Sequence, residues 1–363
     1  MIKAAVMHNF NEPLKIETVT LSEPREDEIL VRMVASGVCH SDLSVTQAKI
    51  PLPPPAILGH EGAGVVEAVG KGVKHLTPGD HVVLSWVQNC GRCHFCVGGR
   101  PHLCEGAIKD AMSGEDFVFQ LNGSPIGRLA GVGSFASKTV VRASAAVKIP
   151  KDVPLDRACL VGCGVMTGVG AAINTVDIEP GQTVAVFGCG GVGLNVIQGA
   201  ALCGSGQIIA VDLMPSKLEM AKQFGATHVV NGKEADAPSA IRELTDGLGV
   251  DYAFEVIGAP AVINQAFLSI KRGGAAVVVG VPGFTDQVQV PGMMFALEEK
   301  SIIGSLYGSA NMQRDMQRLC DLYMHKKLKI DELVSRKIKL EQINEAFEAM
   351  QQGEVARSVI VYE

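Results

Sequence analysis

Alternating apolar strands and short helices between residues 165 and 305 constrain this chain more than any other sequence feature. TVAVFG (183–188) and QIIAVD (207–212) are short apolar runs, and each precedes a helical segment of about ten residues. These helical segments are GGVGLNVIQGAALCG (190–204) and PSKLEMAKQFG (215–225), and the alternation continues to residue 280. Such alternation is typical of a doubly wound parallel sheet.

A glycine pattern marks the first strand-to-helix turn of this region. Gly188, Gly190 and Gly193 form G-x-G-x-x-G, and the next strand ends at Asp212, 24 residues after Gly188. The glycines let the backbone turn tightly and approach a pyrophosphate, which the N–H groups of the helix N-terminus bind. Asp212 would accept hydrogen bonds from the adenosine ribose and repel a 2′-phosphate, so the pattern favours NAD over NADP. The alternative is a glycine-rich turn without a ligand.

The rest of the chain predicts a second domain that is split in sequence. A chain of 363 residues is too long for one ordinary core. EILVRMVAS (28–36) and GAGVVEAVG (62–70) indicate strands, and the final segment RSVIVYE (357–363) is a strand without a partner nearby in sequence. We therefore expect that strand to return to the first domain. Residues 1–164 and 306–363 are predicted as a β-rich domain, and residues 165–305 as the inserted α/β domain.

Charge and composition exclude several classes of protein. The net charge is −6 without long runs of Lys or Arg, which argues against nucleic acid or an anionic membrane as a partner. The N-terminus lacks the apolar core of a signal peptide, and no window reaches the roughly 18 apolar residues of a membrane helix. We therefore expect a cytoplasmic protein whose ten cysteines are metal ligands or core residues rather than disulfides.

Four cysteines lie close together in NCGRCHFCVGGRPHLC. Cys90, Cys93, Cys96 and Cys104 follow the spacing C-x2-C-x2-C-x7-C. Four thiolates suit tetrahedral zinc, and a site without an open position is structural. An iron–sulfur cluster of the bacterial type would place the fourth cysteine nearer and follow it with proline, which this sequence does not. Free thiols without a metal are the remaining alternative.

Three further residues offer a Cys₂His set. Cys39 lies in GVCHSDLS, His60 in ILGHEGAG and Cys163 in VGCGVMTGVGAA. Each alone is more often a core residue or a hydrogen-bonding histidine than a ligand. Together they match a catalytic zinc site, which keeps its fourth position for water or substrate. The remaining cysteines are interpreted as core or helix residues: Cys159, Cys189, Cys203 and Cys320. Cys189 in the glycine turn is a candidate for oxidation.

Five motifs in this order give the chain a resemblance over its whole length. GVCHSD, GHEGAGVV, the four-cysteine segment, GCGVMTGVGAA and FGCGGVGL are similar to those of the zinc-dependent medium-chain alcohol dehydrogenases. The resemblance implies a β-rich GroES-like catalytic domain, split in sequence, and a Rossmann domain, with the active site between them. It also implies two zinc ions per chain, one catalytic on Cys39, His60 and Cys163, and one structural on the four clustered cysteines.

The same resemblance implies roles for residues near the catalytic zinc. Asp42 would orient His60, Glu61 would assist ligand exchange, and Ser41 would take the proton from the alcohol. Zinc would lower the pKa of the alcohol, whose carbon then passes a hydride to the nicotinamide. Ser44 stands where many relatives carry the histidine that ends the proton relay, and His40 stands where some carry a phosphate-binding arginine.

The resemblance also implies contacts to cofactor and substrate. The expected cofactor contacts are His40, Thr167, Gly188, Gly190, Gly191, Val192, Gly193, Asp212, Lys217, Val279, Val281 and Arg357. The alternative for the valines is ordinary core, and for Lys217 and Arg357 a solvated charge. The expected substrate pocket is formed by Ile50, Trp86, Leu129, Ala130 and Leu306. An apolar pocket with one polar end suits a primary alcohol or aldehyde of medium-chain, allylic or aryl type.

The resemblance favours a homodimer. The segment from Cys104 to Phe135 has the length found in dimeric relatives, and GVPGFTDQVQVPGMMF (280–295) is predicted to supply an edge strand for the partner. The main alternative function is oxidation of a thiol–formaldehyde adduct, for which Arg128 or Lys109 would bind the carboxylates of the thiol. A zinc-ribbon protein that binds nucleic acid and a non-catalytic use of the fold are weaker alternatives.

Overall fold

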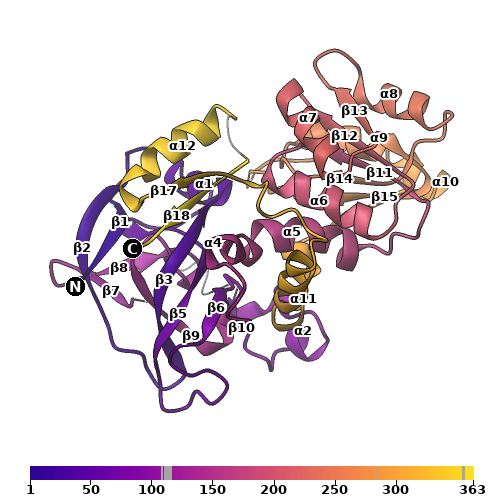
Figure 1. Cartoon of the computed structure of the whole chain (residues 1–363). Helices are drawn as coiled ribbons and strands as arrows, with labels where there is room; N and C mark the ends of the chain where they lie inside the picture. The colour runs from indigo at the N-terminus through magenta and orange to yellow at the C-terminus, as the bar shows by residue number, and fades with distance from the viewer. Residues whose placement is uncertain (108, 110–116, 284, 354–355) are drawn as a thin grey trace. The chain divides into compact units, whose positions relative to one another are not determined.

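The chain folds into two compact units (Figure 1). The computed structural model describes residues 1–107, 109, 117–283, 285–353 and 356–363. Unit 1 comprises Met1–Gly164 and Asn311–Glu363, and unit 2 comprises Val165–Ala310. The second boundary therefore lies five residues later than the sequence analysis placed it. The boundary lies later because η6 (Tyr307–Ser309) is hydrogen-bonded to η5 (Ala171–Thr175) of unit 2. Thr175 Oγ1 lies 2.9 Å from Ser309 Oγ.

Unit 1 consists mainly of β-strands in two sheets. A closed barrel has the order β1 (Ile2–Met7), β2 (Lys15–Leu21), β7 (Phe119–Leu121), β8 (Ser124–Arg128), β4 (Ala56–Ile57). The second sheet has the order β10 (Ala146–Ile149), β6 (His81–Leu84), β5 (Glu61–Val69), β3 (Glu28–Val38), β18 (Arg357–Val361), β17 (Val334–Ile338), and β9 (Lys138–Arg142) pairs with β3.

β3 is the long central strand of the second sheet, and its sequence explains its position. Ile29, Val31 and Met33 alternate with more exposed residues and are at most 1% exposed, so one face of the strand enters a hydrophobic core. The last residues, from Ala35 to Val38, are buried on both faces. The strand therefore begins as a half-buried strand and ends in the interior, next to the predicted metal ligands.

The C-terminal strand returns to unit 1, as the sequence predicted. β18 pairs antiparallel with β3, from Ser358 opposite Val38 to Val361 opposite Ala35. The two predicted C-terminal helices are α11 (Met312–Met324) and α12 (Ile343–Gln351). α11 buries Met312, Met316, Leu319 and Cys320, the spacing of one helix face. Unit 1 is therefore assembled from both ends of the chain.

Unit 2 is the predicted doubly wound sheet. Its six strands are all parallel, in the order β13 (His228–Asn231), β12 (Gln207–Asp212), β11 (Thr183–Phe187), β14 (Val250–Glu255), β15 (Ile270–Val278), β16 (Ser301–Gly304). The principal helices are α6 (Gly191–Leu202), α7 (Pro215–Phe224), α8 (Ala237–Leu244), α9 (Pro260–Ser269). Strand order reverses at β11, which lies between β12 and β14 and precedes the glycine turn. Ligands of such sheets bind at this point, outside the carboxyl ends of the strands.

The segment predicted as a dimer-forming edge strand is not a strand within this chain. Among the described residues of 280–295 the backbone is irregular until α10 (Met293–Leu297), and β16 occupies the edge of the sheet. Pro282 and Pro291 lack the N–H that a strand ladder needs, but a strand that pairs across a dimer requires a second subunit, so the expected edge strand stays a prediction. In the other segment used for the dimer prediction, residues 108 and 110–116 lie outside the described part of the chain.

Among the described residues, no single helix is long and apolar enough to cross a bilayer. One pair, Leu155–Gly162 with Gly164–Thr175, passes this test of length and composition only when its two parts are taken together, and they are bent by 56°. The pair contains α4 (Leu155–Ala158), η4 (Cys159–Gly162) and α5 (Gly164–Gly170).

Asp251 at the start of β14 provides a test of how unit 2 is stabilised. Burial opposes its ionisation, but the Lys271 ammonium at 2.6 Å and two hydrogen bonds from Thr183 outweigh burial and lower the pKa of Asp251. A carboxyl with a lowered folded-state pKa stabilises the fold above about pH 4, and this contribution is lost as pH falls through the folded-state pKa.

We therefore expect Asp251→Asn to lower the urea midpoint of unfolding at neutral pH, by about 1 kcal/mol in the free energy of unfolding. The difference from the unmodified protein should shrink as pH falls below about 4. The control is Glu243→Gln at an exposed position of α8. A difference that stays constant down to strongly acid pH would contradict the assigned role of the Asp251 charge.

Candidate metal centres and dinucleotide site

The register of two neighbouring strands brings the first two predicted ligands together. β3 ends at Val38 and β5 begins at Glu61, and Gly37 faces Glu61 across the antiparallel pair. Cys39 therefore follows one strand and His60 precedes the other at the same end of the sheet. Their exposed fractions are only 5% and 4%, so both side chains are held in the interior.

Asp42 holds Cys39, Gly59 and His60 in place. Its Oδ2 accepts a hydrogen bond from the Cys39 N–H at 3.0 Å, and its Oδ1 accepts one from the Gly59 N–H at 3.0 Å. The same Oδ1 lies 3.0 Å from His60 Nδ1. Because a carboxylate only accepts hydrogen bonds, Nδ1 donates to Asp42, which leaves Nε2 as the ring nitrogen that can bind a metal once it has lost its proton. This geometry supports the predicted role of Asp42 in orienting His60.

Cys163 reaches the same place from a third segment, directly after η4. That turn lies against the sheet, since a Cβ added to Gly162 would come within 2.8 Å of the Leu84 carbonyl oxygen. The sulfur atoms of Cys39 and Cys163, a ring nitrogen of His60 and a carboxylate oxygen of Glu61 all lie within 4.8 Å of one another. The structure thus collects the three predicted ligands and adds Glu61 to the set.

Glu61 is held by the returning C-terminal strand. Its Oε1 accepts a hydrogen bond from the Gly164 N–H at 3.1 Å and lies 3.3 Å from Arg357 Nη1. Its Oε2 is buried and has no hydrogen-bond partner among the described residues. Burial raises the pKa of Glu61 to about 7, although the Arg357 charge opposes this. Gly37 leaves room for the carboxylate, because an added Cβ would lie 2.0 Å from Oε2.

The charges in this cluster stabilise a cation next to the thiols of Cys39 and Cys163. Burial alone would lower the pKa of His60, but Asp42 and Cys39 raise it well above its ordinary value. A hydrogen bond from Cys163, followed by Arg357 and His60, lowers the pKa of Cys39 well below its ordinary value in spite of burial. Two sulfurs, one imidazole nitrogen and an unpartnered carboxylate oxygen are ligands that zinc accepts. The residues present therefore fit a catalytic zinc ion with one exchangeable position.

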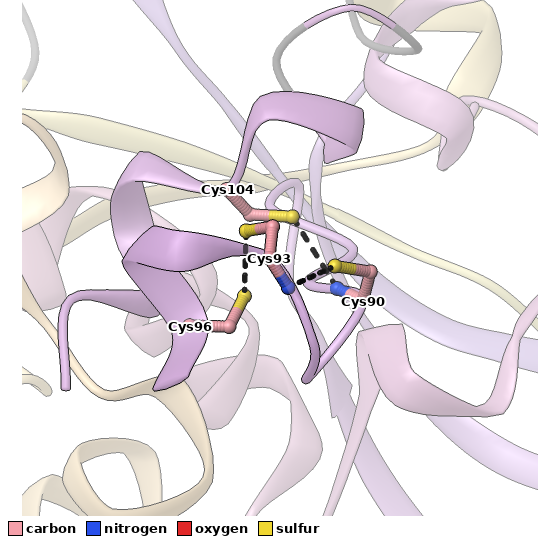
Figure 2. A group of neighbouring side chains, drawn as sticks. All are labelled: Cys90, Cys93, Cys96 and Cys104. Atoms are coloured by element: carbon pink, nitrogen blue, oxygen red, sulfur yellow. Dashed lines mark hydrogen bonds between the residues drawn. The ribbon is translucent and has the colours of Figure 1, made fainter. Parts of the chain in front are cut away.

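The four clustered cysteines form a second group of metal-ligand atoms. Their sulfurs lie within 4.8 Å of one another, and α2 (His94–Val97) and η1 (Pro101–Leu103) shape the loop around them (Figure 2). The Cys93 N–H donates to Cys90 Sγ at 3.3 Å, and the Cys90 N–H donates to Cys104 Sγ at 3.3 Å. Cys104 is fully buried, whereas Cys90 is exposed.

The backbone around this group favours thiolates. N–H groups of Arg92 and Cys93 lower the pKa of Cys90 to about 6, whereas burial and the neighbouring thiols raise the pKa of Cys96 to about 12. Only a cation at the centre would let all four sulfurs ionise together. The donor set fits structural zinc, as the spacing predicted.

The glycine turn of unit 2 has the geometry of a phosphate-binding loop. Gly190 caps the N-terminus of α6, and Gly188 adopts a left-handed φ of 98°. A Cβ added to Gly193 would lie 1.8 Å from the Gly188 carbonyl oxygen, so only glycine lets the helix approach the turn. The first N–H groups of α6 have no partner inside the helix and can bind a phosphate.

Asp212 lies at the carboxyl end of β12, beside this turn. Its Oδ2 accepts a hydrogen bond from the Cys189 N–H at 2.8 Å, and its Oδ1 accepts hydrogen bonds from Leu213 and Met214. These bonds fix the carboxylate, and a carboxylate has about four acceptor positions, so capacity remains for ribose hydroxyls. The remaining acceptor positions of Asp212 fit the ribose hydroxyls of a dinucleotide.

The remaining predicted cofactor residues differ in their surroundings. Val279 is buried at 8% exposure, but Val281 is 75% exposed, which contradicts the alternative that Val281 belongs to the core. Ile257, which the sequence analysis missed, is also 56% exposed and follows β14. The backbones of Gly258 and Val281 approach closely, so two exposed apolar side chains flank the carboxyl edge of the sheet. The sequence feature that could have indicated Ile257 was the apolar pair VI, directly after the end of a strand.

Three predicted cofactor residues of unit 2 are half-buried: Thr167 in α5, Val192 in α6 and Lys217 in α7. His40 of unit 1 is exposed. Arg357 differs from the solvated charge considered as an alternative, because it is only 5% exposed and pairs with Glu61. Its predicted contact with the cofactor phosphates stays a prediction.

Four of the five predicted pocket residues belong to one hydrophobic cluster of unit 1. Leu129 and Ala130 are buried in it, and Ile50 and Trp86 pack against it. Leu306 belongs to unit 2. Sequence analysis missed Gln88, whose Nε2 donates to the Ala130 carbonyl at 3.2 Å and holds the turn between Leu129 and Gly131. No sequence signal could have revealed this contact across 42 positions.

Ser41 lies in α1 (His40–Thr46), a short helix that the sequence did not reveal. Its Oγ is 3.9 Å from Cys39 Sγ, so the predicted proton acceptor is at the metal cluster. Ser44, in the same helix, is half-buried. Cys189, the proposed oxidation site, is 1% exposed, and burial raises the pKa of its thiol. The structure therefore disfavours its oxidation.

Asp42→Asn should lower the zinc affinity of the cluster, and any turnover that depends on it, about 10- to 100-fold, because the amide removes the charge that holds the His60 proton on Nδ1. The measurement is kcat/KM together with the zinc content of the purified variant. Asp321→Asn, at a position remote in sequence on α11, is the control. Wild-type turnover in Asp42→Asn would show that His60 needs no charged partner.

Comparisons with known proteins identify two domains in the chain. The alcohol dehydrogenase GroES-like domain model matches residues 25–151, and the zinc-binding dehydrogenase model matches residues 191–324. The NDMA-dependent alcohol dehydrogenase of Amycolatopsis methanolica is 39% identical over 366 residues, covering 99% of this chain and 98% of that protein.

Two solved structures extend the similarity to three dimensions. An alcohol dehydrogenase zinc-binding domain protein from Burkholderia ambifaria has a TM-score of 0.96 at 39% identity, covering 100% of this chain and 99% of the other. The benzyl alcohol dehydrogenase of Acinetobacter calcoaceticus has a TM-score of 0.95 at 36% identity, with coverage of 100% and 99%. The relatives and both domain models indicate an enzyme that oxidises or forms alcohols. The chain therefore belongs to the zinc-dependent medium-chain alcohol dehydrogenase family.

Proposed function

We propose that this enzyme transfers a hydride between NAD and a primary alcohol or aldehyde of medium-chain, allylic or aryl type. The observation that carries the proposal is the buried cluster of Cys39, His60 and Cys163, with Ser41 beside it. The fixed carboxylate of Asp212 beside the glycine turn supports NAD rather than NADP, since a second negative charge there would be repelled.

Several residues of this chain have separate roles in the proposed reaction. When bound, zinc would supply a Lewis acid for the substrate oxygen, and NAD would supply the hydride acceptor. Ser41 Oγ would accept the hydroxyl proton of the substrate and release it toward solvent. Asp42 keeps the proton of neutral His60 on Nδ1, and the Arg357 guanidinium holds Glu61 in place. Ser44 would be a weaker outlet for the proton than a histidine, because its hydroxyl does not titrate near neutral pH.

Pocket composition supports an apolar substrate. Leu129 and Ala130 are each 7% exposed, and Trp86 packs against the same cluster. An aromatic ring beside aliphatic side chains suits an aryl or allylic alcohol. The similarity to benzyl alcohol dehydrogenase supports the aryl option.

Cofactor use is the part of the proposal to test first. The experiment follows oxidation of ethanol, hexanol, benzyl alcohol and geraniol by the zinc-loaded protein, separately with NAD, NADP and NDMA. The NDMA arm is included because the Amycolatopsis relative is named for dependence on it. We expect NADH formation with NAD and the apolar primary alcohols. Turnover only with NADP, or only when NDMA is present, would overturn simple NAD-dependent oxidation.

The alternative substrate, a thiol–formaldehyde adduct, has less support. It needs an accessible cation for carboxylates, but Arg128 is only 1% exposed and donates to the Val140 carbonyl. Lys109 is exposed but is a single charge. Formaldehyde with glutathione is therefore added to the panel, and activity with this mixture alone would favour the alternative.

A homodimer and a cytoplasmic location complete the proposal. Met293 and Leu297 of α10 are 72% and 71% exposed, and no further strand among the described residues pairs with the outer edge of β16, which supports association of two copies. Light scattering after gel filtration tests the dimer. A reducing compartment suits a chain in which the ten cysteines are metal-ligand candidates or core residues.

A further inference from the structure

A buried acid at the carboxyl end of β14 lies beside the predicted dinucleotide site and has no role in the alcohol chemistry described above. Glu255 is the last residue of β14 and is 0% exposed. β14 pairs with β11, where Phe187 lies opposite Glu255, and the glycine turn begins directly after Phe187. The acid and the turn therefore lie at the same edge of the sheet, where strand order reverses.

One oxygen of Glu255 binds the loop that follows the strand. Its Oε1 accepts hydrogen bonds from the N–H groups of Ile257 at 2.9 Å, Gly258 at 2.8 Å and Ala259 at 3.4 Å. Ala259 is the N-cap residue of α9, and its methyl side chain accepts no hydrogen bond. Glu255 therefore supplies the acceptor for three successive N–H groups between the strand and the helix.

This side chain acts through a single atom. Its second oxygen, Oε2, is buried and has no hydrogen-bond partner among the described residues. No cation in the described part of the chain forms an ion pair with Glu255, and the three N–H groups oppose the rise that burial causes in its pKa. A charged acceptor forms stronger hydrogen bonds than a neutral one. The Oε1 contacts are therefore what the carboxylate contributes to the loop.

The loop held by Glu255 packs against the glycine turn. A Cβ added to Gly188 would lie 2.7 Å from Ile257 Cγ1 and 3.1 Å from Val256 Cγ2, and a Cβ added to Gly193 would lie 3.2 Å from the same Val256 atom. The Val256 N–H also donates to the Phe187 carbonyl oxygen at 3.1 Å, directly before the turn. A shift of this loop would therefore move the backbone that is predicted to bind the pyrophosphate.

The main chain of Glu255 is held independently of its side chain. The Glu255 carbonyl oxygen accepts a hydrogen bond from the Val279 N–H at 2.8 Å. Val279 follows β15, is 8% exposed and is one of the predicted cofactor contacts. Because these main-chain contacts remain when the side chain is replaced, substitution of Glu255 should release the loop and leave the end of the strand in place.

We infer that Glu255 is a positioning residue for the dinucleotide, because its carboxylate holds the loop after β14 in the conformation that supports the glycine turn. The inference rests on the proposed use of NAD and adds a residue outside the G-x-G-x-x-G pattern and Asp212. Glu255 acts through the loop and not on the reacting atoms. Its replacement should therefore change the affinity for the cofactor more than the rate of the chemical step.

Two variants of the zinc-loaded, full-length protein test this role, with dissociation constants for NAD, NADH and NADP measured by calorimetry. Glu255→Ala should weaken NAD and NADH alike, at least about tenfold, because the loop must be ordered when the cofactor binds. The KM for NAD should rise by a similar factor, with a smaller change in kcat. Glu255→Gln keeps a neutral acceptor and should weaken both forms only about threefold.

Amide hydrogen exchange without cofactor provides a second measurement. Exchange at residues 257–259 should be faster in Glu255→Ala, because three N–H groups lose their acceptor. Asp251→Asn is the matched control, since Asp251 is a buried carboxylate, 8% exposed, near the amino end of the same strand. It should lower stability but leave both the exchange at 257–259 and the dissociation constants unchanged.

The outcomes separate this inference from the proposed function. Absence of dinucleotide binding in the unmodified protein would overturn the proposed function and the role of Glu255 with it. Unchanged cofactor affinity in Glu255→Ala, or an equal loss in Asp251→Asn, would overturn the role of Glu255 alone. If Glu255→Ala does not fold, Glu255→Gln decides, because wild-type affinity together with faster exchange at 257–259 would show that the loop does not position the cofactor.

Discussion

Cys39→Ala should lower kcat/KM for alcohol oxidation by about a thousandfold or more. Cys39 is a buried member of the cluster whose ligand atoms lie within 4.8 Å of one another, so its loss removes one of the two sulfur ligands. Losing the ion removes several kcal/mol of stabilisation of negative charge on the substrate oxygen. Since each 1.4 kcal/mol is a factor of ten in rate, the loss amounts to about three orders of magnitude.

Three measurements separate this loss from unfolding. Zinc content should fall by one ion per chain, NAD binding at the glycine turn should persist, and the melting temperature should change little. Cys320→Ala is the matched control, because Cys320 is also buried, at 1% exposure, but lies in α11. Retention of more than about a tenth of the activity in Cys39→Ala would show that the reaction does not use this cluster.

Cys104→Ser should produce the largest loss of stability. Cys104 is fully buried, accepts a hydrogen bond from the Cys90 N–H and belongs to the four-sulfur group around which the loop is organised. Structural zinc contributes its binding energy to folding, so loss of one ligand should cost more than about 3 kcal/mol. For a unit of this size we expect the melting temperature to fall by about 10 °C.

Metal analysis and limited proteolysis accompany that experiment. One zinc ion per chain should remain, and cleavage should appear between Cys90 and Cys104. Cys203→Ser is the control, because Cys203 is a half-buried cysteine outside both clusters. Loss of both ions would mean that the two metal sites fold together, and unchanged stability would mean that the four cysteines do not hold a structural ion.

Local patterns predicted the parts of this protein that depend on local physics. Alternating strands and helices identified the parallel sheet of unit 2, and the position of β11 where strand order reverses agrees with the glycine pattern that follows it. Spacing alone indicated the four-cysteine group, because its members lie within one loop of 15 residues. In each case the interacting groups are close in sequence, so their geometry follows from chain connectivity.

Other features depended on contacts that sequence spacing does not encode. The described part of 280–295 forms no strand within this chain and β16 lies at the edge of the sheet, so the edge strand expected there, which needs a partner subunit, stays a prediction. The boundary at Ala310 was set by hydrogen bonds between η5 and η6, and α1 was too short to give a helical period. Short elements take their conformation from their neighbours rather than from their own residues.

The catalytic cluster shows most clearly which features the sequence determined and which the tertiary structure decided. The sequence by itself determined which residue types could bind a metal: two cysteines and a histidine with an aspartate and a glutamate close by. Only the tertiary structure decided their arrangement, through the pairing of Gly37 with Glu61 and of Val38 with Ser358. That pairing buries the Glu61 carboxylate next to Arg357, a residue 296 positions away, and leaves one oxygen beside the ligands without a hydrogen-bond partner among the described residues. Strand register is fixed by the packing of both sheet faces over their whole length, which no short motif contains.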